Sequence, residues 1–167
     1  MYGWFLVSMW LHLLAAIVWI GGLAFISMVL APTLRDPALR AQAVPLLRAA
    51  GRKFMRIGYA SIVVLIVTGT TNLILKAGGS FAAVEAWWPT PYGRLLMAKL
   101  VLVALVIALS LYHDFAVGPA ATRAMQVEPG SPAALALRRR AALLGRANAL
   151  LSLVIMTLAL LLVRGLP

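Results

Sequence analysis

The sequence contains no cysteine. Disulfide bonds, iron–sulfur clusters and thiolate metal sites are therefore excluded. Charge is also scarce, because Asp, Glu, Lys and Arg make up 11% of the residues and only 4 of them are acidic. A soluble domain of 167 residues could not bury a composition that is 63% hydrophobic, so a water-soluble protein is excluded as well.

Four long apolar segments account for this composition. They are residues 4–30, 57–75, 95–112 and 147–163. Each has about 17–27 residues, which is enough for a helix to cross ~30 Å of hydrocarbon. The sequence therefore predicts an all-α fold, an integral membrane four-helix bundle, with residues 1–167 forming a single transmembrane domain in the lipid bilayer.

The basic residues gather in two of the three connections between these segments. The first connection carries Arg35, Arg40, Arg48, Arg52, Lys53 and Arg56, and the third carries Arg123, Arg138, Arg139, Arg140 and Arg146. Membrane proteins place such loops in the cytoplasm, so the net charge of +11 indicates orientation, and no nucleic-acid partner is expected. We expect a multi-pass protein of the inner (plasma) membrane of a bacterium, with both termini outside.

The connections also carry local signals. Residues 46–54 have helical apolar spacing and are expected to form an amphipathic helix that runs into the second span. Gly118-Pro119 and residues 128–132 are helix breakers and predict a loop in the third connection. Trp87, Trp88 and Tyr92 in the second connection are typical of an aromatic belt at the membrane surface.

Ionisable and amide groups inside the spans are candidates for function, because they are costly in lipid. At ~1.5 Å per residue, His12 and Lys99 should lie about 12 and 10 Å below the outer surface, and His113 about 31 Å below it. Depth alone predicts two clusters. The outer cluster comprises His12, Asn72, Lys99 and Arg94, and the inner cluster comprises His113, Asp114, Arg56, Arg146 and Asn148.

Each candidate has a plain structural interpretation beside the functional one. His12 is either a ligand of a metal or haem, or a histidine bonded to a neighbouring helix. His113 is either a ligand or an ion-paired residue at the membrane boundary. Lys99 either contacts an anionic ligand or extends toward the outer surface. The methionines are scattered and suit packing better than copper, while Gly21-Gly22 allows close helix packing or makes room for a flat ligand.

The order of several motifs resembles a known family. The motifs are His12 with Trp19-Ile-Gly21-Gly22-Leu23, Arg52-Lys-Phe54-x-Arg56, Thr68-Gly69-x-x-Asn72, Pro91-Tyr92-Gly93-Arg94-Leu95-x-x-x-Lys99, His113, and Arg146-x-Asn148. They resemble the CopD-type copper resistance membrane domain and the related HemJ-type protoporphyrinogen oxidases. The match is closer to CopD, because HemJ-type proteins carry Asn-Glu-x-Pro in the last helix and here Ala149 follows Asn148.

The resemblance implies two cofactors. HemJ-type relatives bind haem b through the histidine that corresponds to His12, and Lys99 or Arg94 could then pair with a haem propionate. His12 and His113 differ in depth by roughly 19 Å, so they are not expected to share one haem. His113 would be the ligand of any second haem, facing Arg56 and Arg146. CopD-type relatives are linked to copper, which is the alternative metal.

Three functions follow from these observations. The first is a haem b protein in electron transfer or membrane redox chemistry, which would make the chain a haem-dependent oxidoreductase working with a redox partner or a quinone. The second is copper uptake or transport of the CopD type. The third is a structural subunit of a membrane complex. Catalytic residues are not assigned, and a homo-oligomer is compatible with each function.

Overall fold

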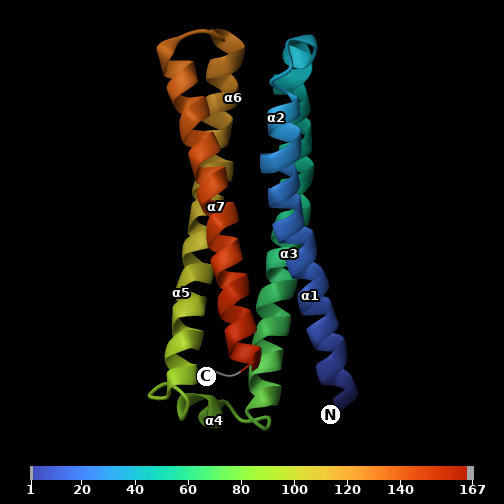
Figure 1. The fold of residues 1–167 in the computed structure, drawn as a ribbon, viewed down its shortest axis with the longest axis vertical. Coiled ribbons are helices and arrows are strands. Elements are labelled where there is room, and N and C mark those ends of the chain that lie inside the picture. The colour runs from blue at the N-terminus through green and yellow to red at the C-terminus, as the bar shows by residue number, and fades with distance from the viewer. Residues whose placement is uncertain (1, 165–167) are drawn as a thin grey trace.

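The protein is built from four long helices, without a β-strand, over residues 2–164, which the computed structural model describes apart from the side chain of Arg40. Each of the four is long and apolar enough to cross a membrane. Helices are expected there because backbone N–H and C=O groups in lipid must be paired within their own segment. The predicted all-α membrane bundle is confirmed, and Figure 1 shows it as two hairpins side by side.

The first hairpin pairs α1 with α3. The helix α1 (Tyr2–Ala24) continues through the π-helical segment η1 (Phe25–Leu30) into a last turn, α2 (Ala31–Thr33). A short 3-10 turn, η2 (Pro37–Leu39), leads into α3 (Arg40–Lys76). The amphipathic segment predicted before the second span is therefore the first part of α3.

The second hairpin pairs α5 with α7. It is joined to the first through the short helix α4 (Phe81–Glu85). The helix α5 (Pro91–Tyr112) continues through the π-helical segment η3 (His113–Val117) into α6 (Gly118–Val127). A turn then leads into α7 (Pro132–Arg164). The arginine-rich connections lie at one end of the bundle, here called the basic end, and α4 lies at the other, the α4 end (Figure 1).

The loop predicted at Gly118-Pro119 is wrong, because the helix continues through both residues. Pro119 occupies the first turn of α6, where its missing N–H costs least. A Cβ on residue 118 would lie 3.0 Å from the carbonyl oxygen of His113, so glycine suits the wide π-helical turn that precedes α6. The breakers at residues 128–132 do separate α6 from α7.

The two hairpins meet in a small apolar core. Trp19 of α1, Ile62 of α3 and Val106 of α5 are buried against one another. Leu151 and Ile155 of α7 pack against this group. All four spans therefore contribute to one core, which lies midway along the bundle.

Close packing of α1 on α3 depends on Gly22. A Cβ at this position would overlap the ring of Phe54. Leu47 and Ala50 are half-buried on the same side of α3 as Phe54, whereas Leu46 is exposed. Of the two roles considered for the glycine pair, the structure gives Gly22 the packing role.

Aromatic residues close the α4 end. Nζ of Lys76 donates to the hydroxyl of Tyr92 at 3.2 Å and lies 4.5 Å from the centre of its ring. The same ammonium donates to the carbonyl of Leu162 at 3.5 Å. The ring of Trp87 meets Tyr92 edge-on at 5.2 Å between centroids. These residues tie the ends of α3, α5 and α7 together at the level predicted for the aromatic belt.

Candidate functional site

His12 on α1 is bonded to Thr68 on α3. Its Nδ1 lies 2.8 Å from Oγ1 of Thr68. That hydroxyl donates its own hydrogen to the carbonyl of Val64 at 2.6 Å, as threonine in a helix commonly does. A hydroxyl has a single hydrogen, so Thr68 accepts from His12, and Nδ1 carries the ring proton. Nε2 of His12 therefore keeps a free lone pair.

The ring of His12 is also held by the packing of α1 on α3. A Cβ at Gly69 would lie 3.2 Å from Cε1 of His12, so the imidazole rests directly on the backbone of α3. One turn away on α1, the hydroxyl of Ser8 donates to the carbonyl of Thr68 at 3.4 Å. The pair Thr68-Gly69 thus sets both the tautomer and the position of the imidazole.

Lys99 on α5 brings a positive charge to the same level. It is half-buried and lies close enough to His12 for its charge to act on the ring. The only ion pair among the described side chains joins His113 to Asp114, so Lys99 has no carboxylate partner among them. A half-buried cation without a counter-charge is costly in lipid.

The other two members of the predicted outer cluster, Asn72 and Arg94, have no hydrogen-bonded contact with His12 that the structure shows. Asn72 is half-buried, and its Oδ1 has no hydrogen-bond partner among the described residues. Arg94 is exposed near the start of α5. Neither makes a hydrogen bond to His12 or Lys99 in the described part of the chain. The structure therefore places Lys99 within electrostatic range of His12, and a role of Asn72 and Arg94 in binding stays a prediction.

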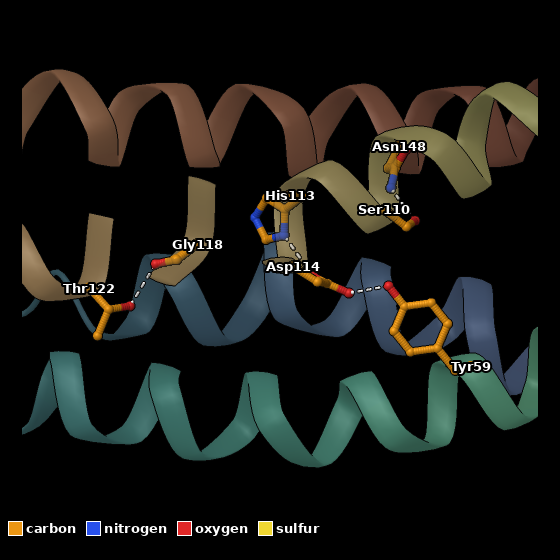
Figure 2. A network of polar contacts seen from close by, with 7 residues as sticks. All are labelled: Tyr59, Ser110, His113, Asp114, Gly118, Thr122 and Asn148. Carbon is orange, nitrogen blue, oxygen red and sulfur yellow. Dashed lines mark hydrogen bonds and ion pairs between the residues drawn. The ribbon is translucent and has the colours of Figure 1, made fainter. Parts of the chain in front are cut away.

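His113 opens η3, between α5 and α6, and is bonded to a carboxylate (Figure 2). Its Nδ1 lies 2.9 Å from Oδ1 of Asp114. Asp114 reaches across to α3, where the hydroxyl of Tyr59 donates to its Oδ2 at 3.2 Å. The contact joins the two hairpins, and Nε2 of His113 has no hydrogen-bond partner among the described residues. π-helical turns occur frequently at functional sites, and this one places His113 and Asp114 between the hairpins.

A second polar pair lies between α5 and α7, about one turn before His113 along α5 (Figure 2). The amide of Asn148 donates to the hydroxyl of Ser110 at 2.7 Å. Asn148 is 4% exposed, and its Oδ1 has no partner among the described residues. Ser152 donates to the carbonyl of Asn148 at 2.7 Å. This pair ties α5 to α7 and makes no hydrogen bond to His113.

The arginines of the predicted inner cluster lie at the right depth but face outward. Arg56 is exposed on α3. Arg146 is also exposed, and its Nε donates to the carbonyl of Ala142 on its own helix at 3.2 Å. Their contact with a ligand at His113 stays a prediction.

Two partners of the histidines were not assigned from the sequence. Thr68 stood in a motif with Gly69, but nothing in the sequence showed that its hydroxyl would face His12. Tyr59 carried no signal at all, because an aromatic residue near the end of a span is ordinary. Both contacts depend on how α3 is rotated toward its neighbours.

The comparisons with known proteins agree with this architecture. Residues 48–164 match the family described as copper resistance protein D. The matched range starts within α3, so it includes Lys99 and His113 and leaves out His12. The chain is also similar to an uncharacterized protein of Aquifex aeolicus (strain VF5), with 32% identity over 112 residues, 66% of this chain and 68% of that protein. No solved structure matches the chain. Because the family match covers most of the sequence, this membrane protein belongs to the copper resistance protein D family.

Proposed function

We propose that the protein binds haem b through Nε2 of His12 and works in electron transfer or another redox reaction of the membrane. The hydrogen bond from Nδ1 of His12 to Thr68 is the observation that carries this proposal. A histidine that ligates a metal almost always donates its other ring N–H to an oxygen of the protein, which fixes the tautomer and the orientation of the ring. His12 has this partner, and its remaining nitrogen is free.

The donors around His12 suit haem better than a bare copper ion. Copper held by side chains alone takes several His, Met or Cys ligands. Within residues 2–164, no three His, Cys, Asp or Glu side chains gather as a metal site. Met9 and Met97 are exposed on the helix surfaces. A porphyrin supplies most of the ligands of its own iron and needs only axial ones from the protein, so one oriented histidine is sufficient.

Lys99 fits the anionic side groups of haem. Its ammonium lies near His12 without a carboxylate partner in the described chain, and a propionate would supply the missing charge. When bound, haem would supply an iron that carries one electron at a time. The chain would hold this group with His12, neutralise it with Lys99 and keep it out of water within the bundle. A membrane quinone or a redox protein would exchange electrons with it.

Membership of the copper resistance protein D family favours a second function, copper uptake or tolerance. Four apolar helices and this family fit a multi-pass protein of the inner membrane. We place the basic end in the cytoplasm and the α4 end outside, because basic loops stay on the cytoplasmic side. A relation to the HemJ-type oxidases stays a prediction.

An absorption spectrum with a metal analysis of the same sample separates the two functions. We expect a Soret band, sharp α and β bands on reduction, and iron in the amount of the haem. His12→Ala should lose the haem and still insert and elute as a single species in detergent. Leu11→Ala, at an exposed position beside His12, is the control and should keep it. A colourless wild-type protein carrying stoichiometric copper would establish the second function, and full haem in His12→Ala would show that His12 is not the ligand.

A further inference from the structure

A hollow on the half of α3 that is nearer the basic end gathers three basic side chains. It has a volume of about 210 Å³ and is lined by Ala49, Arg52, Lys53 and Arg56. The spacing of these residues places them on one face of the helix. All four are exposed, and we call this feature the basic hollow.

The charges of the basic hollow are not neutralised by the protein. Where side chains are described, the only ion pair joins His113 to Asp114, and it involves none of the residues of the hollow. The whole chain has only 4 acidic residues against 15 basic ones. Three like charges within five consecutive positions repel one another, so the hollow would be stabilised by an anion from outside the chain.

The same face of α3 becomes apolar immediately beyond the hollow. Ala60, Val63 and Val67 continue it toward the α4 end, and all three are exposed. These positions suit contact with acyl chains, because they lie in the apolar part of a membrane-spanning helix. The basic hollow therefore lies where lipid headgroups meet the hydrocarbon.

An apolar hollow lies beside the basic one, between η1 and α3. It has a volume of about 200 Å³ and is lined by Gly22, Phe25, Ile26, Leu30, Ala50, Phe54 and Ile57. Basic and apolar recesses thus adjoin on one side of the first hairpin. This pairing matches a molecule with an anionic head and hydrocarbon chains.

We propose that this side of the first hairpin binds an anionic glycerophospholipid. The phosphodiester lies in the basic hollow, and an acyl chain follows the apolar face from Ala60 to Val67. Arginine suits this role because its planar guanidinium forms paired hydrogen bonds with phosphate oxygens. A lipid with net negative charge is preferred over a zwitterionic one, whose own cation would meet Arg52, Lys53 and Arg56. The proposal does not depend on haem binding.

Native mass spectrometry of the full chain in detergent tests the site. The probes are phosphatidylglycerol and phosphatidylcholine with identical acyl chains. The test variant is Arg52→Gln/Lys53→Gln/Arg56→Gln. The matched control is Arg123→Gln/Arg138→Gln/Arg139→Gln, which removes three exposed charges at the same end of the bundle. If the test variant does not fold, Lys53→Gln alone replaces it.

We expect phosphatidylglycerol to bind more tightly than phosphatidylcholine to the wild type and to the control. Each charge removed from the hollow should weaken the binding of phosphatidylglycerol by about fivefold, so the triple variant should bind it about a hundredfold more weakly. Equal binding of the two lipids would overturn the proposal, as would an equal loss in the control. Displacement of the lipid by excess inorganic phosphate would show a phosphate site in place of a lipid site.

Discussion

Thr68→Val tests whether the hydroxyl of Thr68 orients His12 for a metal. Valine keeps the shape of threonine and removes the oxygen that accepts from Nδ1 at 2.8 Å. Hydrogen bonds between membrane helices are worth about 1–2 kcal/mol at most. Loss of this bond should therefore weaken haem binding by about five- to thirtyfold. A loss of this size agrees with the effect of removing outer partners of metal-ligating histidines, which is about 10–100-fold.

The assay is a titration of haem into protein that was produced without it, followed at the Soret band in one detergent. Thr71→Val is the matched control, because Thr71 lies almost one turn further along α3, is exposed, and bonds only to the carbonyl of Val67, at 2.9 Å. Thr68→Ser keeps a hydroxyl and should restore most of the affinity. The reasoning fails if Thr68→Val binds haem like the wild type, or if Thr71→Val loses as much affinity.

Three further predictions concern packing, the second histidine and orientation. Gly22→Ala should lower the free energy of unfolding in detergent by about 1–3 kcal/mol, because its Cβ meets an aromatic ring, whereas Gly21→Ala enters open space and should not; equal effects would contradict this packing. If the free Nε2 of His113 holds a second haem, a pyridine haemochrome assay should find two haems per chain and His113→Ala should remove one; a wild-type ratio of one that His113→Ala leaves unchanged would exclude the site. Single cysteines at Ser80 and Ser131 should react with an impermeant label from the outside and the inside, respectively, and the reverse result would show the opposite orientation.

The positions of the four spans could be predicted because the hydropathy of the sequence determines where membrane-spanning helices form. Apolar runs of sufficient length leave the chain no alternative to helices in lipid. The helix through Gly118-Pro119 could not be predicted in this way. Glycine and proline usually break helices, but here a π-helical turn precedes them and Pro119 needs no hydrogen-bond partner at the start of α6.

The sequence could predict how deep each candidate residue lies in the membrane, but it could not predict how each helix is rotated about its own axis. A rise of ~1.5 Å per residue placed His12 and Lys99 at one level, and in the structure the charge of Lys99 does act on the ring of His12. The same rule placed Arg56 and Arg146 beside His113, but both turn outward. Rotation depends on which residues pack between helices, and contacts such as the bond of His12 to Thr68 follow from that packing.

The division of the bundle into two hairpins bears on how the chain is assembled. Most helix-to-helix contacts lie within a hairpin. The connection between the hairpins starts with a turn in which Gly78 and Gly79 have φ of 74° and 88°, and it continues through α4. The first hairpin can therefore insert and pack while the ribosome is still making the second. A chain divided between Gly78 and Gly79 should then yield two fragments that enter the membrane separately and reassociate through the core around Trp19. Docking of the second hairpin would be the step that carries Lys99 toward His12, so the proposed site around His12 would be completed only at the end of synthesis.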